Sequence, residues 1–258
     1  MVEFIDAMNE FDGHIMIFDG HGVDNSREPV GKLLIGKDEV DVWELRGRVR
    51  MPPIAILSAC DTHGLDASSQ ATVGNGFLAI GVRTVLATLL PVGGISSAIF
   101  IARLLHRIAD FLPAALKANE RTLDWTEVMS GMLRMLLASE IVGELVAAEH
   151  GDFSNRESIQ MKANMDINSG EERWFENLVQ NVAEIRNETV EAATNHVQRV
   201  IAHSEAVRYV QLGNPETIKV SSEEIRADVM REYDIANGRQ VARSPWVFRL
   251  HRSRIHRR

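Results

Sequence analysis

The sequence predicts an α/β fold with a mostly parallel central sheet, together with a helical region, and three observations support this interpretation. Short apolar runs occur at His14–Phe18, Ile54–Ser58 and Val82–Leu89, each bounded by turn residues. Helical patterns separate these runs, as they do in βαβ units that build a parallel sheet. Beyond residue 120, apolar residues recur mainly at helical spacing.

Local signals define the remaining elements of the first half. Lys32–Gly36 is predicted as a minor strand and Val42–Val49 as a short helix. Gly74–Ile80 is predicted as a helix, because Gly81 follows it at a position that favours a helix C-terminus. Ile95–Leu112 is predicted as a helix that packs over the strand Val82–Leu89.

The second half is predicted to be mostly helical. Leu123–Ala148 has apolar residues at helical spacing, and the polar stretch His150–Glu172 is predicted as a loop. A single helix of about 35 residues is expected from Trp174 onward. Val207–Leu212 is predicted as the last strand, and Ser221–Glu224 as the start of a C-terminal helix, because it offers a hydroxyl cap and early acids.

Charge is distributed unevenly along the chain. The formal net charge of -8 argues against a general nucleic-acid binder, so we expect no direct nucleic-acid partner. Residues 235–258 hold seven arginines and no acid, which leaves 21 basic and 36 acidic residues in 1–234, a net charge of -15. The basic tail, 239–258, is typical of a disordered or partner-docked terminus. The alternative is that the tail binds an anionic partner.

Composition and local patterns point to a protein of the cytoplasm without a membrane anchor. The chain has 258 residues, enough to bury a core without disulfides, and Cys60 is its only cysteine. The N-terminus has no basic region followed by an apolar run, so no signal peptide is visible. Residues 84–102 carry no charge, but Pro91–Gly94 interrupts them, which favours a buried strand and helix over a membrane span.

Two residues with catalytic chemistry follow apolar runs. His21 comes just after one run and Cys60 just after another. In an open parallel sheet, active sites form beyond the carboxyl ends of the strands, so neighbouring strands would bring the imidazole close to the thiol. A histidine can then deprotonate a cysteine nucleophile. The N–H groups of Gly22 and Cys60 could hold a developing oxyanion. The alternative is that Cys60 is a small buried core residue.

Five segments together resemble a known family. His14–Gly22 (HIMIFDGHG) resembles the strand and His-Gly motif of the caspase-like cysteine peptidases, and Ile54–Thr62 (IAILSACDT) resembles their Cys motif. Further segments are similar to the CHAT family, which comprises bacterial caspase-like domains often attached to tetratricopeptide repeats. These segments are Leu33–Ile35, Phe77–Val92 and Val210–Pro215. The likeness covers about 1–115 and again 207–216.

The resemblance implies a three-layer αβα caspase-like fold and a cysteine endopeptidase. It implies His21 as general base and Cys60 as nucleophile, with an oxyanion hole formed by the N–H groups of Gly22 and Cys60. A protein substrate would be hydrolysed through a thioester, without a metal or another cofactor. It also implies latency until an activating or regulatory protein partner engages, for which a tetratricopeptide protein is one candidate.

The resemblance also sets the expected domains. A peptidase domain is predicted over 1–220, with a helical region at 120–206 inside it, followed by a C-terminal helix and basic tail at 221–258. The family fold normally has a further strand and helix before the His motif, so the sequence leaves open that the chain is a fragment. The oligomeric state stays open as well.

Asp61 and Asp19 are the acidic residues beside the predicted dyad. Asp61 could line a pocket for a basic P1 side chain or could cap the next turn. The segment Phe18–Gly22 also resembles the DGHG motif of metal-dependent phosphatases, in which Asp19 would bind metal. That family needs further acidic ligands, and none stands at a suitable place. A catalytically inactive docking module of the same fold is the other alternative.

Overall fold

A computed structural model describes residues 2–23, 31–59, 62–63, 71–145, 153–222 and 247–249. The chain forms two compact units. One unit comprises residues 1–128 and 210–258, and the other comprises residues 129–209. The first unit holds the central sheet, whereas the second is helical.

A four-stranded sheet lies at the centre of the first unit, with the strand order β1-β5-β6-β8. The strands are β1 (Ile15–Asp19), β5 (Ile54–Ser58), β6 (Thr84–Thr88) and β8 (Tyr209–Gly213). β5 pairs in parallel with both β1 and β6. Every residue of β5 and β6 is buried, which explains why both strands appear as continuous apolar runs. The predicted α/β class and mostly parallel sheet are confirmed.

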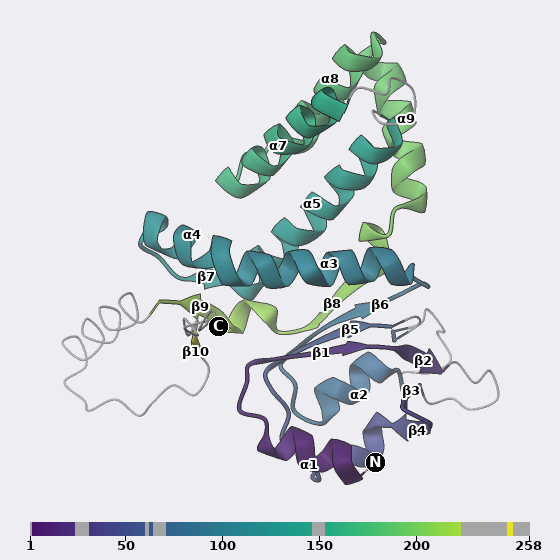
Figure 1. The fold of residues 1–258 in the computed structure, drawn as a ribbon, viewed down its shortest axis with the longest axis vertical. Helices are drawn as coiled ribbons and strands as arrows, with labels where there is room; N and C mark the ends of the chain where they lie inside the picture. Colours follow the sequence, from purple (N-terminus) through teal and green to yellow (C-terminus); the bar gives the residue numbers. More distant parts are fainter. Residues whose placement is uncertain are drawn as a thin grey trace, which may run out of the picture. The chain divides into compact units, whose positions relative to one another are not determined.

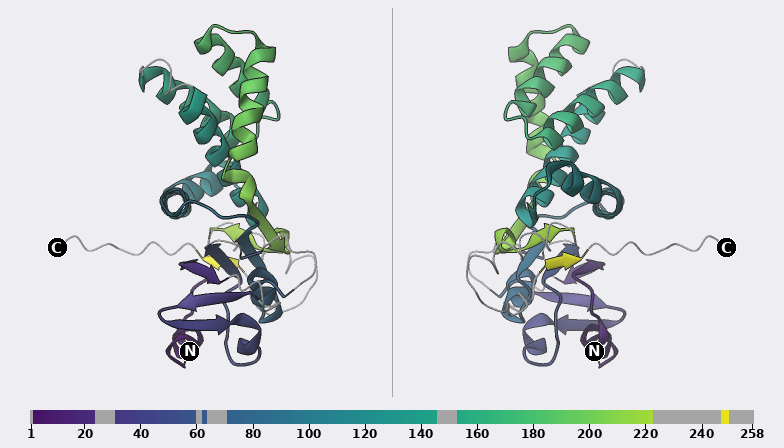
Figure 2. Two further views of the ribbon diagram at one scale, coloured as in Figure 1. Left: turned by 90° about the vertical axis from the view of Figure 1, so that its right-hand side faces the viewer. Right: turned by 90° about the vertical axis from the view of Figure 1, so that its left-hand side faces the viewer.

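Helices cover both faces of this sheet (Figures 1 and 2). α1 (Val2–Glu10) and α2 (Val73–Ala79) lie on one face, and α3 (Gly94–His106) lies on the other (Figure 1). The helix predicted over Ile95–Leu112 continues further. α3 passes through a π-helical turn, Arg107–Phe111, into α4 (Leu112–Asn119). The arrangement is compatible with the three-layer caspase-like fold that the resemblance implied.

The chain also forms two smaller sheets. The first has the order β2-β3-β4 and is antiparallel, with β2 (His21–Val23), β3 (Lys32–Ile35) and β4 (Asp38–Asp41). The predicted minor strand is therefore the central strand of this sheet and forms a hairpin with β4. The helix predicted over Val42–Val49 is a single 3₁₀ turn, Val42–Leu45, which the Asp41 side chain caps by accepting from the Trp43 N–H.

The other small sheet has the order β10-β9-β7. Its strands are β7 (Leu123–Asp124), β9 (Lys219–Ser221) and β10 (Val247–Arg249). Ser221 therefore ends a strand, and the prediction that it starts a helix is wrong at that residue. The rest of the predicted C-terminal helix and basic tail lies outside the described residues, apart from Ser222 and β10.

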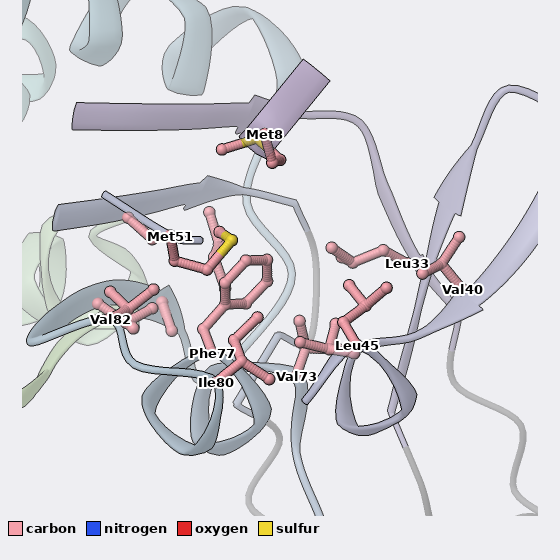
Figure 3. Close-up of a cluster of buried hydrophobic side chains, with 14 residues drawn as sticks. Met8, Leu33, Val40, Leu45, Met51, Val73, Phe77, Ile80 and Val82 are labelled. Carbon is pink, nitrogen blue, oxygen red and sulfur yellow. The ribbon is translucent and has the colours of Figure 1, made fainter. Parts of the chain in front are cut away.

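The core under the sheet is formed where α2 packs against the strands. Phe77 is fully buried there and lies beside Met51 in the centre of the cluster (Figure 3). Two glycines end the elements around this core. Gly81 follows α2 with φ +108° and Gly213 ends β8 with φ +84°, conformations that L side chains adopt rarely. The predicted helix end at Gly81 is confirmed.

The second unit contains most of α5 (Trp125–Leu145), together with α7 (Phe153–Ser169), α8 (Trp174–Arg186) and α9 (Val190–His203) (Figure 2). The loop predicted over His150–Glu172 is wrong, because α7 occupies most of it. Ile159, Ala163 and Ile167 recur every four residues and are buried. Met161 and Met165, which are exposed, lie between these positions, so apolar residues alternate along 159–167 and obscure the helical spacing.

The single long helix predicted from Trp174 is also wrong. Asn187 adopts a left-handed conformation, with φ of 52°, and ends α8. The Thr189 side chain then caps α9 by accepting from the Ala192 N–H. The predicted last strand, Val207–Leu212, starts as a 3₁₀ turn over Ala206–Arg208 and becomes β8 afterwards.

Domain limits remain a prediction. The first unit includes both ends of the predicted peptidase domain, and the second corresponds closely to the predicted helical region at 120–206.

None of the described helices combines the length and apolar character needed to cross a bilayer.

Candidate active site

The carboxyl ends of β1 and β5 lie side by side. Asp19 pairs with Ser58 at the last position of the two parallel strands. One residue further, the Gly20 N–H donates to the Ser58 carbonyl at 3.3 Å. The described chain from β5 continues to Ala59, which is buried. The two strands that precede the predicted dyad are thus direct neighbours in the sheet.

His21 begins β2 immediately beyond this point and is exposed to solvent. It stands opposite Leu34, and Gly22 stands opposite Leu33 in the antiparallel pair with β3. Cys60 and Asp61 lie outside the described residues, as do residues 64–70, which include the predicted loop Gly64–Ser69. The dyad therefore stays a prediction. The described residues nearest to Cys60 in the sequence are Ala59 and Thr62.

A hydrogen-bonded group of three side chains joins the two strand ends to α3. The Ser58 hydroxyl donates to the Asp19 carboxylate at 3.2 Å and also forms a hydrogen bond with the Ser97 hydroxyl. Ser58 and Ser97 are buried, whereas Asp19 is exposed. Because buried hydroxyls need partners, these contacts fix the relative position of β1, β5 and α3 at the two strand ends that precede His21 and Cys60 in the sequence.

Thr62 and His63 connect the predicted nucleophile segment to α2. The Gly74 N–H donates to the Thr62 carbonyl at 2.8 Å. His63 is partly buried, and its Nδ1 forms a hydrogen bond of 2.9 Å with the hydroxyl of Thr72, the N-cap residue of α2. Burial lowers the pKa of His63 below its ordinary value of 6.5, because the charged imidazolium loses hydration.

This shift predicts an acid-sensitive contact. A histidine with a lowered pKa in the folded state contributes stability above its unfolded pKa, and this contribution is lost as the pH falls through the folded pKa. We expect the melting temperature of the wild type to fall more between pH 7.5 and pH 5 than that of His63→Asn. Thermal melts at both pH values measure this difference. An equal fall in the two proteins would contradict a role for His63 protonation.

His14 lies away from the predicted site. Its carbonyl accepts from the Ile54 N–H at 3.2 Å, at the start of β1 and β5. His21 follows the opposite end of β1. The structure thus separates these two histidines by the length of a strand.

Asp19 does not belong to a metal-binding cluster among the described side chains. No group of three or more His, Cys, Asp or Glu residues there could hold a metal ion. One Asp19 oxygen accepts from the Ser58 hydroxyl instead. Asp19 thus has a structural contact in the sheet, and this observation does not support the phosphatase alternative.

Several polar residues near the site were not selected from the sequence. They are Ser58, Thr62, Thr88 and Ser97, and all four are buried. For Ser58 and Thr88, the sequence offers one signal: a hydroxyl residue ends an otherwise apolar run, as in IAILS and TVLAT. A buried hydroxyl at a strand end needs a partner, but the sequence does not indicate which strand supplies that partner.

One comparison with known proteins matches the part of the chain that contains the candidate site. A family model of the CHAT domain matches residues 3–123. These residues include β1, β2, β5 and β6, the strands that surround the candidate site. A search of curated proteins found no match.

Proposed function

Residues 3–123 form a CHAT domain, a domain related to the caspase-like cysteine peptidases, and from this premise we propose that the protein is a cysteine endopeptidase. The observation that carries the proposal is the parallel pairing of β1 with β5, in which Asp19 stands opposite Ser58. His21 and Cys60 each follow these paired residues by two positions. Such equivalent positions at the carboxyl ends of neighbouring strands suit a base and a nucleophile.

The proposed reaction begins with proton transfer from the Cys60 thiol to the His21 imidazole. The thiolate attacks the carbonyl carbon of the scissile peptide bond, and a C–S bond forms. The N–H groups of Gly22 and Cys60 stabilise the oxyanion of the tetrahedral intermediate. As the C–N bond breaks, the leaving amine takes the proton from the His21 imidazolium, and a thioester remains.

Water then completes the reaction. His21 removes a proton from the water molecule as it attacks the thioester carbonyl, and the C–S bond breaks. The peptide acid leaves, and the Cys60 sulfur recovers its proton from His21. His21 is exposed and lies at the start of a short strand, so its imidazole is accessible to substrate and to water.

We further propose that the peptidase is latent in the bacterial cytoplasm until a protein partner activates it. The support for this regulation is the family resemblance alone. A tetratricopeptide protein is one candidate activator. We propose no direct nucleic-acid partner, because a net charge of -8 disfavours binding to a phosphate backbone.

A peptide library and a thiol-directed acyloxymethyl ketone probe test the proposed activity. We expect one probe per chain, attached to Cys60 and identified by peptide mass spectrometry, and hydrolysis that the probe abolishes. Because latency is part of the proposal, the assay is run with and without candidate activators. Hydrolysis that persists after complete modification of Cys60 would exclude the cysteine mechanism.

Specificity for the P1 residue gives a further prediction. Asp61 directly follows the proposed nucleophile, and a carboxylate pairs well with a guanidinium through charge-assisted hydrogen bonds. We expect Arg or Lys to be preferred at P1, and Asp61→Asn to lower kcat/KM for an arginine substrate by about 10-fold or more. Peptide-library profiling of the two proteins measures the change. A preference for P1 Asp, or an unchanged rate in Asp61→Asn, would remove Asp61 from specificity.

A further inference from the structure

Thr88, the last residue of β6, binds the chain on both sides of Cys60 and Asp61. Its hydroxyl donates to the Ala59 carbonyl at 2.6 Å, just before Cys60. Its backbone N–H donates to the Thr62 hydroxyl at 2.9 Å, just after Asp61. The Thr62 N–H also donates to the Thr88 hydroxyl, at 3.4 Å.

The remaining polar group of Thr88 also contacts the chain next to Cys60 and Asp61. Its carbonyl accepts from the His63 N–H at 2.9 Å. Every polar group of Thr88, both main-chain groups and the hydroxyl, thus contacts residues that flank Cys60 and Asp61. Thr62 and Thr88 are fully buried, so water cannot replace these hydrogen bonds without a rearrangement.

We propose that Thr88 is a positioning residue for Cys60, an inference that rests on the proposed peptidase function. Only Cys60 and Asp61 separate the two anchored residues, Ala59 and Thr62. Thr88 thus holds the described residues on both sides of this pair in place. Since a misplacement of about 1 Å at a reacting group can reduce the rate by about 100-fold, fixing this segment serves catalysis directly.

The Thr88→Val variant removes the hydroxyl and keeps the shape and the main-chain groups. We expect kcat to fall by about 10-fold to 100-fold while KM changes by less than about two-fold, because Thr88 acts on the nucleophile segment and not on substrate binding. Thr88→Ser retains the hydroxyl and should restore kcat to within about three-fold of the wild type. An unchanged kcat in Thr88→Val would overturn the proposal.

Thr84→Val is the matched control on the same strand. Thr84 is equally buried, but its hydroxyl donates to the Leu212 carbonyl at 2.9 Å, at the other end of β6. We expect Thr84→Val to keep the wild-type kcat, even if its melting temperature falls as much as that of Thr88→Val. An equal loss of kcat in both variants would show that general destabilisation, and not positioning, explains the effect.

Two measurements separate this inference from the proposed function. If the wild type hydrolyses no peptide under any activating condition, the proposed function fails, and the pH profile of Cys60 alkylation by iodoacetamide still tests positioning. We expect Thr88→Val, but not Thr84→Val, to shift that profile and to speed amide hydrogen exchange at Thr62 and His63. An unchanged profile together with unchanged exchange in Thr88→Val would overturn the inference independently of activity.

Discussion

Replacing Cys60 with alanine is expected to abolish peptide hydrolysis, and replacing His21 with alanine is expected to reduce kcat by at least about 1,000-fold. Cys60→Ala removes the atom that forms the thioester, so no covalent intermediate can arise. His21→Ala leaves a thiol without a base, and at neutral pH only a small fraction of an ordinary cysteine is ionised. Steady-state hydrolysis of the best library peptide measures both effects.

The His21 variant should remain folded, because the His21 side chain is exposed at the start of β2. Substitutions at exposed positions usually change the free energy of unfolding by less than about 0.5 kcal/mol. His106 offers a matched control, since it is exposed in the last turn of α3. His106→Ala should retain wild-type hydrolysis.

Alkylation of Cys60 reports on the pairing of the two residues. Iodoacetamide should label the wild type faster than His21→Ala at neutral pH, because an imidazole partner increases the thiolate fraction. Equal labelling rates in the two proteins would count strongly against a paired thiolate. They would then favour the alternative of an inactive docking module.

The central sheet could be predicted because β5 and β6 are buried along their whole length. Burial on both faces selects continuous apolar runs, and turn residues mark where these runs end. The order of the strands could not be derived from such runs. Only the structure shows that β5 lies between β1 and β6 and that Asp19 is level with Ser58.

The helical unit was harder to predict because its signals are local and weak. In α7, the exposed Met161 and Met165 alternate with the buried apolar residues, so the spacing is not clearly helical and the sequence predicts a loop. Asn187 and Thr189 mark the break between α8 and α9. Asparagine and threonine also occur inside helices. The apolar spacing on either side of them therefore predicts one continuous helix.

Some residues of the candidate site could be predicted from the sequence, whereas others could not. His21 and Cys60 could be selected because both follow apolar runs and both stand in segments that resemble the His and Cys motifs of the caspase-like peptidases. Thr88 could not be selected, because threonine is an ordinary strand residue and its role depends on a partner 26 positions earlier in the chain, Thr62. Long-range hydrogen bonds of this kind leave no periodic signal in a sequence.

Phe77→Ala is expected to have the largest effect on stability. Phe77 is fully buried on α2, where its ring contacts the core beneath the sheet (Figure 3). Removal of a buried phenylalanine ring costs about 3–5 kcal/mol, through lost hydrophobic transfer energy and the cavity that remains. For a unit of this size, the melting temperature should fall by about 10 °C. Phe11→Ala is the control, because Phe11 is 40% exposed, and it should change the melting temperature by no more than about 2 °C.

The same substitution should also reach the candidate site. The first turn of α2 holds the segment after Cys60, since the Gly74 N–H donates to the Thr62 carbonyl and the Thr72 hydroxyl bonds to His63. With its anchor in the core removed, α2 is expected to release this segment before the sheet unfolds. Amide hydrogen exchange in Phe77→Ala, measured well below its melting temperature, should therefore increase at His63 and Gly74 more than in β5. Uniform acceleration across α2 and β5 would instead mean that helix and sheet unfold as one cooperative unit.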